Sequence, residues 1–264
     1  MKNLFVYVFL FLNFCVYSQE NQFKIIKVKG GITNKITNLL VKQGDEIAPQ
    51  NPIQFITKEA EAFALIKGKG VYTISKNSSD VFSTANAYLI QDVAVLMTDN
   101  VQLNIRNVSN EFSFSSNNFN NSTLFVIGDS TMLNFSVNQY PLNDNNSISF
   151  ELSVDENDLI IIPEHVNQSI CITKNILKAS LNDTIKNVNI MYYNSMQNSI
   201  NKEATINIVF LNYYELKNEF IEIKNGFNGI ENDKIYRILQ NYFFSVYGLT
   251  NGKDLHEFIM QILE

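Results

Sequence analysis

Between residues 23 and 107, short runs of alternating apolar and polar residues are separated by glycine and proline. This alternation predicts strands, and the breaks between the runs predict turns. The clearest expected strands are residues 23–28, 53–56, 62–66 and 71–74. In the first, we expect Phe23, Ile25 and Lys27 to share one face, with Lys24 on the other. Short strands at this spacing are typical of a small β-sandwich or barrel.

The part of the chain after residue 123 also begins with strand patterns. Its expected strands are residues 124–127, 132–137, 148–154, 159–162, 170–172, 188–192 and 206–211. The pairs Tyr192-Tyr193 and Tyr213-Tyr214 are expected to lie on strands as well, with one ring on either side.

Near the C-terminus the apolar period changes from two to that of a helix. One expected helical face comprises Ile235, Ile238, Leu239, Tyr242, Phe243 and Val246. Gly248 would end this helix, and Thr250 or Asn251 would cap a second amphipathic helix over 255–263. Strands followed by helices predict an α+β domain with its helices on one face of an antiparallel sheet.

The whole chain therefore predicts an α+β fold with two domains. A small N-terminal β-sandwich or barrel is expected over residues 19–107. An antiparallel sheet domain with C-terminal helices is expected over 123–264. The stretch 108–122 is rich in Asn and Ser, so we interpret it as a polar linker.

Residues 1–18 have the features of a cleaved export signal. Lys2 provides the positive start, Leu4 to Tyr17 form an apolar run, and Ser18 precedes the expected cleavage site before Gln19. The run is shorter than the roughly 20 apolar residues that span a bilayer. We therefore expect a periplasmic or secreted protein that does not span the membrane after cleavage.

Composition restricts the chemistry that we expect. The net charge of −6 argues against a nucleic-acid partner, because the phosphate backbone attracts a basic surface. After cleavage the chain keeps one cysteine, Cys171, which we interpret as a buried inert thiol. His165 and His256 are not spaced as a zinc site, and no phosphate-binding glycine loop occurs, so we expect no metal and no cofactor.

The N-terminal turns resemble those of the FecR-like β domain. The matching elements are Val28-Lys29-Gly30, Gly44-Asp45-Glu46-Ile47 and Gly70-Val71-Tyr72. Together with Tyr192-Tyr193, Leu216-Lys217-Asn218-Glu219 and Tyr247-Gly248, they also resemble a group of uncharacterised exported proteins of Bacteroidota. The first resemblance implies a β domain that takes part in protein–protein signalling. Neither resemblance implies site residues.

A second resemblance concerns an enzyme family. The segment 124–131, with Gly128-Asp129-Ser130 after a strand, resembles the first block of SGNH (GDSL-like) esterases. That likeness implies Ser130 as nucleophile, with Asp254 and His256 completing the catalytic set. However, the Asp254-to-His256 spacing is one residue shorter than in the family, and a strand rather than a helix is expected after Ser130.

These observations favour an exported, non-enzymatic envelope protein that binds an envelope protein or a surface polymer. The alternative is an SGNH-like ester hydrolase that uses Ser130.

The export signal leads to a first prediction. In cells that secrete the protein, mass spectrometry of the mature chain is expected to find Gln19 at its N-terminus. Replacing Leu10 and Leu12 by Lys should keep the uncleaved chain in the cytoplasm, because the signal needs an uninterrupted apolar run. An intact leader on the exported protein would contradict the prediction.

Overall fold

The computed structural model describes residues 22–76, 86–97, 121–154, 157–178 and 184–264. The expected signal at 1–18 lies outside these residues, as does the expected linker up to residue 120. Ser122, which was assigned to that linker, begins a strand instead.

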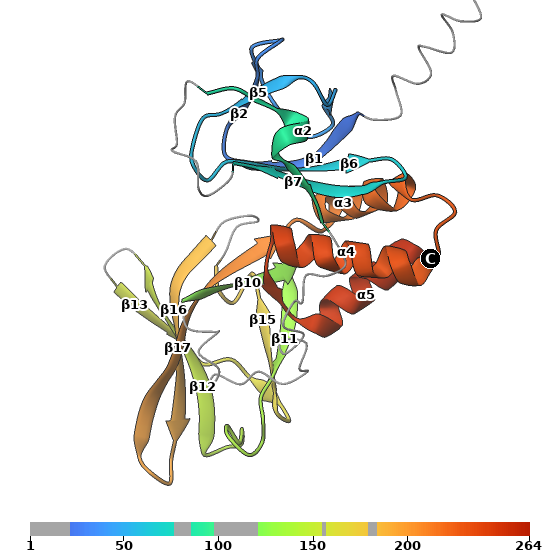
Figure 1. Cartoon of the computed structure of the whole chain (residues 1–264). Coiled ribbons are helices and arrows are strands. Elements are labelled where there is room, and N and C mark those ends of the chain that lie inside the picture. Colours follow the sequence, from blue (N-terminus) through green and yellow to red (C-terminus); the bar gives the residue numbers. More distant parts are fainter. Residues whose placement is uncertain (1–21, 77–85, 98–120, 155–156, 179–183) are drawn as a thin grey trace, which may run out of the picture. The chain divides into compact units, whose positions relative to one another are not determined.

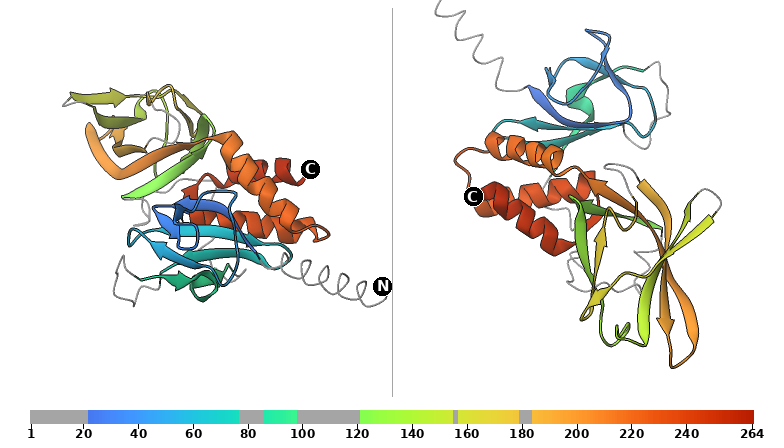
Figure 2. Two further views of the ribbon diagram at one scale, coloured as in Figure 1. Left: turned by 90° about the horizontal axis from the view of Figure 1, so that it is seen from above. Right: turned by 180° about the vertical axis from the view of Figure 1, so that it is seen from behind.

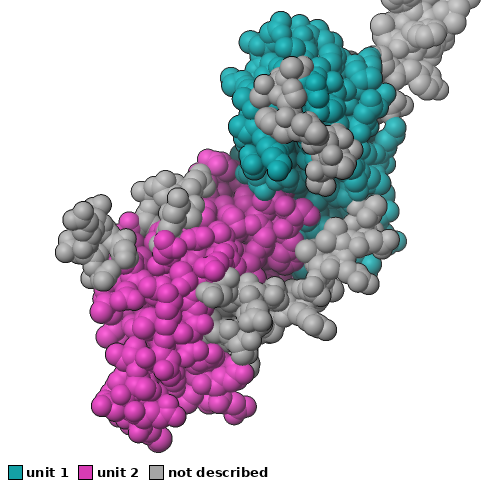
Figure 3. Space-filling model, turned by 60° about the vertical axis from the view of Figure 1, so that its left-hand side comes forward, with its two compact units in different colours: residues 1–101, 218–242 teal, residues 102–217, 243–264 magenta. Residues whose placement is uncertain are grey.

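The described chain forms two compact units (Figure 3). Unit 1 comprises residues 1–101 and 218–242, and unit 2 comprises 102–217 and 243–264. The helical stretch 218–242 thus groups with the N-terminal strands, whereas the expected second domain ran uninterrupted from 123 to 264. The ion pairs of Glu219 and Glu222 described below are the physical reason for this difference.

Unit 1 contains two antiparallel sheets and parts of two helices (Figure 1). The five-stranded sheet has the order β4 (Glu46–Ile47), β1 (Phe23–Lys29), β6 (Glu61–Ile66), β7 (Gly70–Ser75) and β9 (Ala94–Leu96). The four-stranded sheet has the order β3 (Leu39–Leu40), β2 (Ile32–Asn34), β5 (Pro52–Phe55) and β8 (Tyr88–Leu89). Short helix α2 (Ile90–Val93) connects β8 to β9.

Both sheets of unit 1 contribute to one hydrophobic core. Ile25 and Ala64 come from the five-stranded sheet, and Ile32 and Phe55 come from the four-stranded sheet. Strand β6 is buried on both faces, which explains its nearly continuous apolar sequence. The face of β6 that carries Phe63 points away from this core. The Phe63 ring packs edge-on against Tyr242 of α4 (Asn232–Val246), with ring centroids 6.0 Å apart.

A bulge in β1 changes the faces that simple alternation predicts. The pairing with β6 shifts between Ile25 and Lys27, so these two residues lie opposite the adjacent residues Ala64 and Phe63. Lys27 therefore joins Lys24 on the face away from the core, and the expected grouping of Lys27 with Ile25 is wrong.

The two lysines meet two carboxylates on α3 (Tyr213–Gly226). Lys24 pairs with Glu222, and Lys27 Nζ lies 2.7 Å from Glu219 Oε1. Glu219 is 2% exposed, and its other oxygen accepts a hydrogen bond from the Tyr242 hydroxyl at 2.9 Å. Since Glu219 and Glu222 are three positions apart, they share one helix face. These contacts attach the helical segments of unit 1 to its sheet.

Unit 2 also contains two sheets. The six-stranded sheet has the order β13 (Asn157–Ile161), β12 (Asn146–Val154), β16 (Thr184–Asn194), β17 (Ser199–Leu211), β10 (Ser122–Ile127) and β18 (Leu249–Thr250). The three-stranded sheet has the order β11 (Ser130–Asn134), β15 (Ser169–Thr173) and β14 (His165–Val166).

Most pairings in unit 2 are antiparallel, and β16 and β17 form a long hairpin (Figure 2). Strand β10 is an exception, because it runs parallel to both β17 and β18. One core joins the two sheets, with Leu133 and Ile172 on one side and Phe150 and Ile206 on the other. The predicted α+β class, with mainly antiparallel sheets and C-terminal helices, is confirmed.

The C-terminal helices largely follow the predicted pattern. In α5 (Gly252–Leu263), Asn251 caps the helix by accepting hydrogen bonds from the Lys253 and Asp254 amides. The buried apolar face of this helix comprises Leu255, Phe258, Ile259, Ile262 and Leu263. Thr250 instead donates to the Phe125 carbonyl at 2.6 Å.

The apolar pattern did not predict helix α3. The expectation that Tyr213 and Tyr214 lie on a strand is wrong, because these residues begin the helix. Asn212 accepts hydrogen bonds from the Tyr214 and Glu215 amides, as an N-cap does. Buried Phe220 and Ile223 follow at helical spacing. Tyr192 and Tyr193 lie on β16 as predicted.

The buried carboxylate of Glu219 yields a stability prediction. Glu219→Ala is expected to lower the free energy of unfolding by about 2–4 kcal/mol, because Lys27 and Tyr242 each lose an acceptor inside the protein. Urea titration followed by circular dichroism measures it, since the chain has no Trp.

Glu257→Ala serves as the matched control. Glu257 pairs with Lys253 at 3.7 Å on the surface, so its loss should change stability by less than about 0.5 kcal/mol. Equal losses in the two variants would contradict the role assigned to Glu219.

Candidate functional site

The segment around Ser130 forms a corner between the two sheets of unit 2. Strand β10 ends at Ile127, Gly128 has a φ of +80°, and Ser130 begins β11. Strand β11 pairs with β15 rather than β10, so the connection is not a β-hairpin. Ser130 is exposed and lies opposite Thr173.

Asp254, the expected acid of the catalytic set, bonds to a threonine. The buried Thr131 hydroxyl donates to Asp254 Oδ2 at 2.5 Å, and the neighbouring Asn251 amide donates to the Met132 carbonyl at 2.5 Å. Both bonds connect the start of α5 to β11. This arrangement is sufficient to explain Asp254 as a structural residue.

Burial raises the pKa of Asp254 above its ordinary value of 3.8. The Thr131 hydrogen bond opposes this shift, because it stabilises the ionised carboxylate. Nearby Glu257 raises the pKa further, and Lys253 lowers it.

His256, the expected base, lies on a different side of α5 from Asp254. Residues two apart on a helix are separated by roughly 200° about its axis. Asp254 is half-buried against β11, whereas His256 is exposed.

The remaining chemical candidates are dispersed. Cys171 lies on β15 opposite Met132 and is half-buried rather than fully buried. His165 is half-buried in β14, and its Nδ1 lies 3.1 Å from the Asn167 carbonyl oxygen. Within the described ranges, His, Cys, Asp and Glu side chains do not gather in threes or more as a metal site would require.

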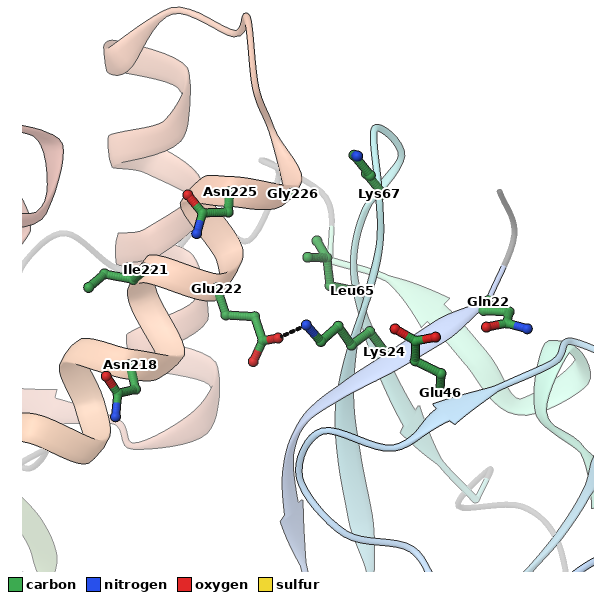
Figure 4. A pocket seen from close by; sticks show the side chains of 10 residues that line it. All are labelled: Gln22, Lys24, Glu46, Leu65, Lys67, Asn218, Ile221, Glu222, Asn225 and Gly226. Atoms are coloured by element: carbon green, nitrogen blue, oxygen red, sulfur yellow. Dashed lines mark ion pairs between the residues drawn. The ribbon is translucent and has the colours of Figure 1, made fainter. Parts of the chain in front are cut away.

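Unit 1 contains a polar groove that sequence reasoning did not find. It has a volume of about 410 Å³ and lies between β1, β6 and the α3 segment of that unit. Lys24 reaches from β1 to Glu222 on α3, with Glu46 beside it (Figure 4). The exposed Lys67 adds a second ammonium at its rim.

The ion pair between Lys24 and Glu222 already neutralises much of the charge in this groove. The hydrogen bond to Glu222 raises the pKa of Lys24, and the charges of Glu222 and Glu46 add to this effect against a smaller opposing contribution from burial. A small polar ligand could bind only in competition with the Lys24–Glu222 pair. The groove lining contains no Ser, Cys or His, so it offers no nucleophile–base pair.

Comparison with protein-family models, curated proteins and solved structures finds no significant match for this chain. Among the helices in the described part of the chain, none is both long and apolar enough to cross a bilayer.

The raised pKa of Asp254 predicts a pH effect on stability. The folded protein binds a proton on the Asp254 carboxyl group more tightly than the unfolded chain does. Lowering the pH through the pKa of the folded state toward 3.8 therefore stabilises the wild type. Asp254→Asn lacks this contribution. The stability of the wild type relative to the variant should therefore rise between pH 7 and pH 4, as measured by urea unfolding.

Thr131→Val provides a second measurement. It removes the hydrogen bond that lowers the pKa of Asp254, so the rise should begin at a higher pH than in the wild type. A pH-independent difference between the wild type and Asp254→Asn would show that the carboxyl group is not perturbed by burial.

Proposed function

We propose that this protein is exported to the periplasm or the medium and acts there by binding, without catalysing a reaction. The partner would be another envelope protein or a surface polymer. The observation that carries this proposal is the hydrogen bond that the Asp254 carboxylate accepts from Thr131. Asp254 thereby connects α5 to β11 instead of orienting a catalytic histidine.

Exposed apolar residues on the long β16–β17 hairpin support a binding role. Met196 at its turn is 93% exposed, and Tyr193 and Ile200 lie opposite each other nearby with 36% and 65% exposure. Aromatic residues and Met are enriched at protein interfaces, whereas such side chains in water cost free energy.

The N-terminal sheets fit the same proposal. We propose that they form a small FecR-like β-sandwich, because both contribute side chains to one core. The FecR-like resemblance of residues 23–76 then suggests a role in protein–protein contact. The export signal at 1–18 supports the envelope location.

The alternative, an ester hydrolase, is favoured by one observation. Ser130 is exposed directly after a strand and a glycine with positive φ. Strand β11 follows Ser130 where the resembling esterases have a helix, so this remains the second candidate.

Two measurements distinguish the candidates. Chemical cross-linking in intact cells, followed by purification of the full chain, should recover a reproducible partner. Purified protein should hydrolyse p-nitrophenyl acetate no faster than the Ser130→Ala variant, with Ser195→Ala as a matched serine control. Ser130-dependent turnover without any cross-linked partner would replace the binding proposal with the hydrolase.

A further inference from the structure

Strand β13 is an unusual edge in this protein. Six of the eight strands at sheet edges in the described part of the chain have two or three residues. The two longer edge strands, β11 and β13, have five residues each. Strand β11 is covered by α5, through Asn251 on the Met132 carbonyl and Asp254 on Thr131. No described residue pairs with the outer side of β13.

The strand also lacks most of the features that usually keep an edge from pairing, and Asp158 is the one charged residue among its five. Its five residues include no Lys and no Pro, and its pairing with β12 is regular along its length. Ile160 is 62% exposed, and Ile162 just beyond the strand is 67% exposed. Figure 1 shows β13 at the margin of its sheet. An edge of this kind is a template for another extended chain.

Charge indicates which kind of chain would pair there. Residues 146–165, which include β12 and β13, contain five acidic residues and no Lys or Arg. The acidic residues are Glu151, Asp155, Glu156, Asp158 and Glu164. A second copy of this edge would bring like charges together, whereas a lysine-bearing segment would be attracted.

We propose that β13 accepts an extended, lysine-bearing segment of a partner protein as an added strand of the six-stranded sheet. This inference rests on the proposed binding function and names the class of partner. Main-chain hydrogen bonds would supply affinity, and alternate side chains would supply specificity.

The two faces of β13 define the partner's pattern. Ile161, opposite Phe150, packs against the core of unit 2, so apolar residues of an added strand would extend that core. Ile160 lies opposite Glu151 on the other face, where lysines of the added strand would meet acidic residues. The expected segment therefore alternates apolar residues with Lys or Arg.

A synthetic peptide tests this directly. The probe is an acetylated, amidated heptapeptide with the sequence Lys-Val-Lys-Val-Lys-Val-Lys, titrated into the full mature chain with isothermal calorimetry up to about 1 mM. Binding is expected, with an affinity that falls as salt rises. The same peptide with Glu for Lys, and a version with Pro for the central Val, should not bind.

Matched variants locate the site. Ile160→Lys should weaken binding of the Lys/Val peptide by about tenfold or more, since it places a charge on the edge and repels the probe. Val137→Lys is the control, because Val137 is 57% exposed in the same unit but lies in a turn outside the six-stranded sheet. It should change the affinity by less than about twofold.

The other outcomes overturn the proposal. Equal binding to the Ile160→Lys and wild-type chains would place the peptide elsewhere, and binding of the Glu/Val peptide would refute the charge argument. Self-association that Ile160→Lys abolishes would identify a second copy as the occupant. If cross-linking in cells recovers the same partner from the wild type and from Ile160→Lys, β13 is not the binding site. The proposed binding function would still stand.

Discussion

A carboxylate with 2% exposure governs the architecture of unit 1. Removing a charge from water costs several kcal/mol unless close partners compensate it. Glu219 has both Lys27 at 2.7 Å and the Tyr242 hydroxyl at 2.9 Å. Lys27 reaches it because the bulge after Ile25 turns that lysine away from the core. The contact joins residues 192 positions apart, so the chain must return to its first sheet after forming all the described strands of unit 2 except β18.

An element could be predicted when the sequence pattern that forms it lies within the element itself. Helix α5 was predicted correctly because all its apolar residues except Met260 are buried on one helical face and Asn251 caps it. The apolar pattern did not predict helix α3, because Tyr213-Tyr214 has strand propensity and the buried charged residue Glu219 interrupts the apolar face of the helix. The bulge in β1 has no sequence signal of its own. It depends on a helix far along the chain that needs Lys27 on its side.

The same limit applies to the candidate site, because the sequence reveals local features but not contacts between distant residues. Sequence spacing correctly placed Ser130 after a strand and Asp254 at the start of a helix. It could not show that Asp254 would accept a hydrogen bond from Thr131, 123 positions away in the chain. The groove at Lys24 was equally hidden, because its partner Glu222 comes from the missed helix.

The exposed isoleucines of unit 2 differ in what surrounds them. Ile200 lies opposite Tyr193 in the β16–β17 hairpin, two positions before Lys202, so the residues around it are not uniformly acidic. Ile160 lies on an edge strand, where unpaired backbone groups accompany the exposed side chain. An apolar side chain alone favours any hydrophobic contact. An apolar strand edge among acidic residues favours a partner that has both an extended backbone and positive side chains. Strand β13 therefore offers a more specific recognition chemistry than the hairpin tip does.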